Sequence, residues 1–300
     1  RYLSKLVSKE VIKLGNSTLS TRNYTYDNLG RLTNVTDSKF GNHTYVYDYR
    51  GFLIKADGIE YSYDGNGNIL SVGSKSFVYN ANNKERLQSA GGLAVTTDNS
   101  GLIKAYNGKE FTYEGRRLTR VKINGNVTYQ YLYDDRGLRI QKSNITNSKN
   151  SYYTYDGDRL VTEINDTCRL DFLYDEYGEL YGFIKDGTDK YFYVRDVFKN
   201  ILGIINSSGS IVVEYRYNPF GLSTSISGTL ASTIGEINPF RYKGYYYDVE
   251  TQLYWVSSRY YSPELCRWIS PDSIEYLDPE SINGLNLYAY CGNDPVNKYD

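Results

Sequence analysis

The chain has 300 residues, among them 35 Tyr and 27 Gly but no Met, and its 34 basic and 35 acidic residues give a formal net charge of -1. Because the opposite charges are spread along the chain, no field exists to gather nucleic acid or an anionic membrane surface, and neither is expected as a partner. Tyrosine at this level suits the half-wet face of a β-sheet better than a packed helical interior, so we expect an all-β fold.

The first residues, Arg1-Tyr2-Leu3-Ser4-Lys5, are neither an initiator methionine nor a signal peptide. No apolar run along the chain is long enough to cross a bilayer. We therefore expect an excised part of a longer protein, with any secretion signal or membrane anchor upstream and no membrane insertion by this segment.

A repeat begins soon after this point, and it determines the predicted fold. The nine residues from Tyr24 to Leu32 read YTYDNLGRL, and similar segments recur at 45–53, 61–69 and 131–138, while 111–114, 153–156 and 172–175 keep only the first half. A weakened copy at 95–103 retains the Asp, the Gly and the following aliphatic residue. The tyrosines before the acidic residue are spaced by 16 to 22 residues, apart from one interval of 34 that holds two units.

One unit is predicted to be a strand, a turn and a strand. Tyrosines two residues apart, such as Tyr24 and Tyr26, point to the same face of a strand, so their rings form a column along the sheet. Asp27 begins the turn by accepting hydrogen bonds from backbone donors, and Gly30 supplies the left-handed conformation that returns the chain. An ordinary sandwich with Asp-Gly turns does not explain why the tyrosine pair and the aspartate occur together.

A single hairpin cannot bury its own face, so neighbouring units must stack in a quasi-one-dimensional array. With about ten repeats in such an array, we expect an elongated molecule that forms an open, partial array. Its exposed edges would be covered by upstream repeats, by self-association or by the C-terminal segment wrapping back, and these three alternatives stay open.

Three cysteines are far apart in the sequence, at Cys168, Cys266 and Cys291, with His43 as the single histidine. This set makes a structural zinc site improbable, and no metal or cofactor is expected. A disulfide between Cys266 and Cys291 is one alternative, and three free thiols are the other.

The composition changes near residue 211, because all six prolines fall between Pro219 and Pro295. We therefore divide the chain into a repeat region, 1–210, and a second region, 211–300. Within the second region the polar stretch between Gly221 and Gly235 is predicted to be a surface loop. Asp278 followed by Pro279 predicts the start of a short helix.

The second region resembles the Rhs repeat-associated core domain. The segments that carry the resemblance are 240–254 (FRYKGYYYDVETQLY), 258–263 (SRYYSP), 267–272 (RWISPD), 286–290 (NLYAY) and 293–297 (NDPVN). With the tyrosine-aspartate (YD) repeats before it, the likeness covers nearly the whole chain. It implies a β-strand spiral that forms a shell around a C-terminal toxin domain and is closed by the core segment, as in secreted bacterial Rhs toxins and toxin-complex C components.

The same resemblance implies an aspartic autoprotease that cuts just beyond a terminal Asp-Pro-x-Gly-Leu sequence and releases the toxin. Two carboxyl groups would share a proton, one activating water and the other polarising the scissile carbonyl. By position, Asp272 and Asp300 match the family aspartates and Arg267 matches a basic residue beside them, although Cys266 stands where the family usually has glycine. The bond to be cut lies outside the sequence, so turnover is expected only in a longer parent chain. The alternative role for Asp272 is to cap a turn.

Teneurins resemble the same shell and use it for cell adhesion, so the fold by itself does not decide the function. The alternative hypothesis is therefore an adhesion or carbohydrate-binding repeat module without toxin cargo. Under the first hypothesis the partners are the toxin domain and upstream YD repeats, and the protein is secreted or on the bacterial cell surface.

Overall fold

The computed structural model describes residues 6–278, 280 and 284–300, and it is almost entirely β-structure. The predicted all-β fold is confirmed, with 23 strands in one antiparallel sheet in which each strand pairs with the next along the chain. The strands are β1 (Lys9–Leu14), β2 (Ser17–Tyr26), β3 (Leu32–Asp37), β4 (His43–Tyr47), β5 (Leu53–Ala56), β6 (Ile59–Tyr63), β7 (Ile69–Val72), β8 (Lys75–Tyr79), β9 (Leu87–Ala90), β10 (Leu93–Thr97), β11 (Ile103–Tyr106), β12 (Lys109–Glu114), β13 (Arg117–Ile123), β14 (Val127–Tyr133), β15 (Arg139–Asn144), β16 (Lys149–Asp156), β17 (Arg159–Asn165), β18 (Arg169–Tyr174), β19 (Leu180–Lys185), β20 (Asp189–Arg195), β21 (Ile201–Asn206), β22 (Ile211–Tyr217) and β23 (Ser223–Ser227).

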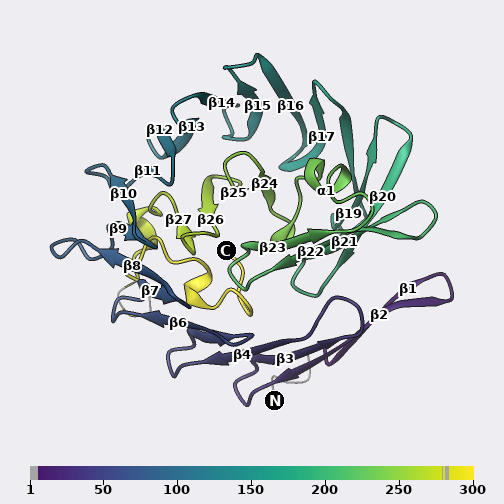
Figure 1. The fold of residues 1–300 in the computed structure, drawn as a ribbon, viewed down its shortest axis with the longest axis horizontal. Coiled ribbons are helices and arrows are strands. Elements are labelled where there is room, and N and C mark those ends of the chain that lie inside the picture. Colours follow the sequence, from purple (N-terminus) through teal and green to yellow (C-terminus); the bar gives the residue numbers. More distant parts are fainter. Residues whose placement is uncertain (1–5, 279, 281–283) are drawn as a thin grey trace.

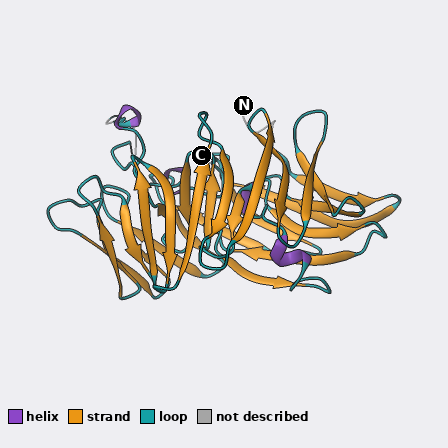
Figure 2. Cartoon of the chain, turned by 90° about the horizontal axis from the view of Figure 1, so that it is seen from above, coloured by secondary structure: helices purple, strands orange, loops and turns teal. Residues whose placement is uncertain are grey.

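The sheet curls into a ring, and the remaining chain folds inside it (Figure 1). Seen from above, the strands stand side by side as the wall of this ring (Figure 2). The first hairpin returns to the last strands, where Arg22 Nη1 donates to the carbonyl of Arg195 at 2.9 Å. The C-terminal segment wraps back into the ring and packs on the apolar face of the sheet, so the array is curled and not elongated (Figure 1). The array is nevertheless open, as expected, because in the described residues β1 pairs only with β2 and β23 pairs only with β22.

The repeating turn has the predicted chemistry. Asp27 Oδ1 accepts the backbone N–H groups of Leu29 and Arg31, both at 2.9 Å, and Gly30 has a φ of 80°. The weakened unit folds the same way, since Asp98 Oδ1 accepts from Ser100 and Leu102. The same pair of bonds forms at Asp48, Asp64, Asp175, Asp196 and Asn218. The last two units were not counted from the sequence.

A register shift accompanies each turn, at the second tyrosine of the unit. Tyr26 pairs with Leu32 directly after such a shift, and the hydroxyl of Tyr47 in the next unit donates to the Leu32 carbonyl at 2.7 Å. A β-bulge leaves a backbone group outside the ladder, and the tyrosine of the following unit supplies its partner. Equivalent bonds join Tyr63 to Leu53, Tyr113 to Ile103, Tyr133 to Leu118, Tyr155 to Arg139, Tyr174 to Leu160 and Tyr217 to Ile201.

The sheet continues past the change in composition. β22 and β23 belong to the ring wall, so the prediction of a surface loop between Gly221 and Gly235 is wrong for residues 223–227, which form the edge strand β23. Backbone pairing with β22 determines that strand, and a polar sequence suits a half-exposed edge. The boundary between the two regions at residue 210 stays a prediction.

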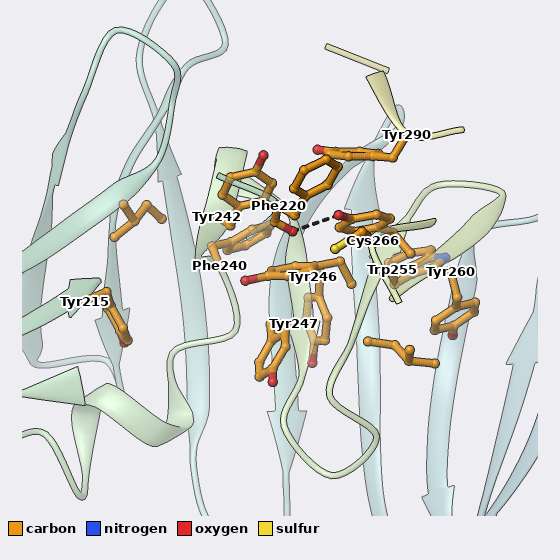
Figure 3. Packing of buried hydrophobic residues seen from close by; sticks show 14 of the residues in the cluster. Tyr215, Phe220, Phe240, Tyr242, Tyr246, Tyr247, Trp255, Tyr260, Cys266 and Tyr290 are labelled. Atoms are coloured by element: carbon orange, nitrogen blue, oxygen red, sulfur yellow. Dashed lines mark hydrogen bonds between the residues drawn. The ribbon is translucent and has the colours of Figure 1, made fainter. Parts of the chain in front are cut away.

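The interior segment forms a second, four-stranded sheet with short helical turns. Its elements are α1 (Ile234–Ile237), η2 (Tyr242–Gly244), β24 (Tyr246–Asp248), β25 (Leu253–Val256), β26 (Arg259–Ser262), β27 (Arg267–Trp268), η3 (Ile274–Tyr276) and η4 (Cys291–Asn293). The helix start expected at Asp278 falls on residues 279 and 281–283, which lie outside the described residues. Aromatic side chains of this segment, including Phe240, Tyr242 and Tyr246, pack together inside the ring (Figure 3).

A buried ion cluster fixes the interior segment to the wall. Arg139 of β15 and Asp248 of β24 are both completely buried, and Arg139 Nη1 lies 2.6 Å from Asp248 Oδ2. Lys142 reaches the other carboxylate oxygen at 3.0 Å. The Arg139 guanidinium also lies over the rings of Tyr246 and Trp255, both at 4.7 Å. These contacts pair each buried charge with an opposite one, which is the condition for tolerating it inside a protein, and they leave Arg139 Nε without a hydrogen-bond partner.

Candidate functional site

Asp272 lies just after β27, where the chain leaves the interior sheet. Its backbone N–H donates to the carbonyl of Leu287 at 3.0 Å, and its Oδ1 accepts the N–H of Ser273 at 2.8 Å. Its Oδ2 lies 2.7 Å from Nη2 of Arg259, at the start of β26. The carboxylate therefore both caps a local turn and forms an ion pair with a residue that the sequence analysis did not select.

Asp300 is brought to the same part of the interior segment. Its Oδ2 accepts the backbone N–H of Cys291 at 2.7 Å. Burial raises the pKa of the Asp300 carboxyl, and the Cys291 N–H and the charge of Arg259 oppose this rise without cancelling it. A carboxyl group with a raised pKa retains its proton to higher pH than a fully solvated one.

Arg259 forms an ion pair with Asp272, and its charge also acts on Asp300. Its guanidinium lies 4.0 Å from the ring centroid of Trp268, and its side chain is mostly buried. Burial lowers the pKa of Arg259, while the charges of Asp272 and Asp300 both act to raise it. The signal was present in the sequence, since Arg259 belongs to the SRYYSP segment, but the segment has no feature that assigns its arginine to Asp272.

Arg267 lies apart from this group. Its Nη2 donates to the carbonyl of Glu85 at 2.9 Å, and its guanidinium lies 4.2 Å from the ring centroid of Tyr288 and 5.5 Å from that of Tyr79. Among the described residues, no ion pair joins it to Asp272 or Asp300. Its contacts instead attach the interior segment to a turn of the ring wall.

The chemistry of this arrangement depends on the difference between the two carboxyl groups. One is ion-paired to Arg259 and borders a cleft of about 480 Å³, and the other accepts the Cys291 N–H and has a raised pKa. Carboxyl groups in such different environments can divide the roles of general acid and general base.

The three cysteines were predicted either to be free thiols or to include one disulfide. Cys168, Cys266 and Cys291 are free and buried, so the alternative of a Cys266–Cys291 disulfide is wrong. Within the described residues, no cluster of three or more His, Cys, Asp or Glu side chains is arranged to hold a metal ion. The described part of the chain also contains no helix with the length and apolar character to span a membrane.

Comparison with known proteins gives consistent matches over nearly the whole chain. The family model described as Teneurin YD-shell matches residues 4–296. The tRNA3(Ser)-specific nuclease WapA of Bacillus spizizenii is 33% identical over 291 residues, which cover 92% of this chain and 10% of that protein. Teneurin-m of Drosophila melanogaster is 25% identical over 285 residues, 92% of this chain and 8% of its own length.

A solved structure of the Photorhabdus luminescens Tc holotoxin pore has the same fold. It superposes with a TM-score of 0.77 at 18% identity and covers 95% of this chain and 17% of its own. The chain therefore spans a small part of each protein that it matches, and the fold similarity extends through both the ring wall and the interior segment.

Proposed function

The chain belongs to the Teneurin YD-shell family, and we propose that, as an Rhs-type YD-shell, it is the closing part of a shell that houses a C-terminal toxin domain in a longer, secreted bacterial protein. The observation that carries this proposal is the position of the interior segment. The ring wall surrounds it, and the C-terminal end of the chain lies inside the ring (Figure 1), where the Asp300 carboxylate accepts the backbone N–H of Cys291. A chain that continued from this point would start inside the ring.

Upstream YD repeats are the second partner in this proposal. In the described residues β1 pairs only with β2, so its other edge has backbone groups free to pair with a preceding strand. Three of the relatives are named as tRNA nucleases and a solved neighbour as a toxin, which supports a toxin shell without identifying the cargo of this chain.

The experiment is to read and express the coding sequence beyond Asp300. We expect a further domain, and we expect added protease to degrade it more slowly in the intact shell than when it is expressed alone. Absence of any downstream domain, or equal digestion of the two forms, would contradict encapsulation.

We further propose that Asp272 and Asp300 form an aspartic autoprotease in the longer chain. One carboxylate accepts a proton from a water molecule, and the oxygen of that water attacks the scissile carbonyl carbon. At the same time the protonated carboxyl group of the other aspartate donates its proton to the carbonyl oxygen. Collapse of the tetrahedral intermediate breaks the C–N bond, and the leaving nitrogen takes the proton that the first carboxylate accepted from water, while the proton on the former carbonyl oxygen returns to the second carboxyl group. Arg259 supports this role by holding Asp272, and Arg267 acts indirectly, through the wall turn that it binds.

Autoproteolysis is tested in the extended protein with Asp272→Asn and Asp300→Asn, by gel electrophoresis and intact mass. Both variants should stay uncleaved, whereas Asp135→Asn, at an exposed position in a wall turn, should be processed like the wild type. Normal processing of Asp272→Asn would remove Asp272 from the mechanism.

An adhesion or carbohydrate-binding role is a second candidate, and the exposed aromatic residues of two wall turns favour it. Tyr49 is 93% exposed and Tyr177 is 81% exposed. Exposed aromatic rings of this kind suit contacts with sugars or partner proteins. If this is the function, the 300-residue chain should bind a glycan array or cells, and Tyr49→Ala with Tyr177→Ala should abolish that binding without changing the melting temperature.

A further inference from the structure

The cleft beside Asp272 is built from both parts of the molecule. On one side lie the turns of three successive wall units, represented by Asn83–Arg86, Asn99–Leu102 and Gly115–Arg116, and on the other lies the interior segment around Pro271 and Leu287. Its volume, about 480 Å³, is in the range of ligand sites in proteins, about 300–1,000 Å³. The turns of the ring wall therefore form one side of this cleft, and the interior segment with Asp272 forms the other side.

Direct hydrogen bonds hold the sides of this cleft in place. Arg267 Nη2 donates to the Glu85 carbonyl at 2.9 Å and fixes the first wall turn. Tyr288 Oη donates to the Gly101 carbonyl at 2.9 Å and fixes the second. These bonds connect residues more than 180 positions apart, so they form only when the interior segment is in place. A site held in this way is preorganised for its ligand.

The side chains of the cleft combine apolar surface with two arginines, Arg86 and Arg116, and two carboxyl groups, Glu85 and Asp272. Leu102, Ile274 and Leu287 supply apolar surface next to Asp272. Arg116 is exposed, and among the described residues its guanidinium has no hydrogen bond or ion pair. Its charge acts on Arg259, the partner of Asp272, so it is close to the proposed catalytic group. An available guanidinium beside apolar surface matches a peptide that carries both an acidic and an aliphatic side chain.

We propose that this cleft binds the peptide on which Asp272 acts, with an acidic side chain on Arg116 and an aliphatic side chain against Leu102 and Leu287. The inference rests on the proposed autoprotease and assigns a specificity-determining residue, Arg116, to the repeat wall. Part of the substrate specificity then comes from the YD turns and not from the core segment alone.

The first test uses a model peptide and the 300-residue chain, which requires no cleavage. The probe is fluorescein-labelled Gly-Leu-Asp-Gly-Leu-amide, and its binding is followed by fluorescence anisotropy. Arg116→Glu should weaken binding by about tenfold or more, as expected for the loss of one charge-assisted hydrogen bond. Arg120→Glu makes the same charge change at an exposed position outside the cleft and should leave the affinity unchanged.

A charge exchange makes this test specific. Arg116→Glu should bind the matched probe Gly-Leu-Lys-Gly-Leu-amide more tightly than the wild-type chain does, and Arg120→Glu should show no such gain. Equal affinities of wild type and Arg116→Glu for both probes, or no binding by the wild type, would overturn the proposed cleft.

The second test separates this inference from the proposed function. In the extended protein, Arg116→Glu should slow self-cleavage by about tenfold or more relative to Arg120→Glu. If the extended protein is not cleaved but the probes bind in the Arg116-dependent way, the autoprotease is wrong and the peptide cleft stands. If the protein is cleaved and Arg116→Glu changes neither cleavage nor probe binding, the cleft alone is wrong.

Discussion

The hydroxyl of Tyr174 donates a hydrogen bond to the backbone carbonyl of Leu160, 2.8 Å away. Leu160 belongs to the preceding unit and pairs with Tyr155 directly after the register shift in that unit. The second tyrosine of the repeat therefore connects one hairpin to the one before it. This explains why tyrosine, and not only an aromatic ring, recurs at this position, since a phenylalanine would fill the same space without supplying the donor.

Replacing Tyr174 by Phe should lower the free energy of unfolding by about 1–3 kcal/mol, because the change leaves the Leu160 carbonyl without its side-chain donor. The measurement is the urea unfolding midpoint at constant slope. Tyr177→Phe, three residues further on at an exposed position, is the control and should change the midpoint little. Equal midpoints for the two variants would contradict a structural role of the hydroxyl.

Substitutions at Gly51 and Gly65 allow the effect of backbone conformation on stability to be measured without any effect of steric crowding. Gly51 has a φ of 88°, Gly65 does not have a positive φ, and an added Cβ would have no neighbour within 4 Å at either position. Gly51→Ala should destabilise the fold by about 1–2 kcal/mol through the left-handed conformation alone. Gly65→Ala should be neutral or stabilising by about 0.4–1 kcal/mol, because alanine restricts the unfolded chain. Thermal unfolding of the two variants would show whether the difference has this sign.

Removing one partner of the buried ion pair between Arg139 and Asp248 should lower the free energy of unfolding strongly. Asp248→Asn leaves the buried Arg139 without its carboxylate and should destabilise the protein by about 3–5 kcal/mol. The more exposed pair of Arg169 and Asp171 is the comparison, and Asp171→Asn should cost about 0–1 kcal/mol. Similar losses for the two variants in chemical unfolding would show that the buried pair does not anchor the interior segment.

The same pair predicts a pH dependence. Burial opposes ionisation of Asp248, but the charges of Arg139 and Lys142 outweigh it and hold the pKa of Asp248 below its ordinary value. The folded state therefore binds this proton more weakly than the unfolded state, and the stabilisation is complete above the unfolded pKa, about 4. The stability difference between wild type and Asp248→Asn should shrink as the pH falls from about 5 towards the depressed folded pKa. A difference that grows on acidification would contradict this sign.

The three thiols should be unreactive in the folded protein. Burial raises the pKa of Cys266 and of Cys291 to about 12, and it also raises the pKa of Cys168. Since the thiolate is the reactive form, a thiol reagent at pH 8 should label the native chain slowly and reach three equivalents after addition of guanidinium chloride. Rapid native labelling would indicate that a thiol is accessible, and fewer than three equivalents after unfolding would indicate a disulfide.

The sequence determined the repeating unit because its chemistry is local. The carboxylate of Asp27 binds N–H groups two and four residues ahead, and Gly30 adopts its positive φ within the same turn. Because these contacts join residues only two to four positions apart, the sequence pattern predicts them directly. Even the weakened copy around Asp98 could therefore be identified from its Asp, Gly and aliphatic residue. The family likeness similarly selected the segment 267–272, which ends at Asp272, and by position it selected Asp300, three residues after the segment 293–297.

The tertiary structure decided the contacts between distant residues. The curl of the sheet, the pairing of Arg139 with Asp248 across 109 positions and the placement of Arg259, rather than Arg267, on Asp272 all depend on where the interior segment packs in the ring. No period or spacing encodes these contacts, because they arise from burial of two apolar surfaces that are separate in the chain. The sequence therefore determined the unit and the candidate carboxylates, whereas packing determined which cation and which wall turns surround them.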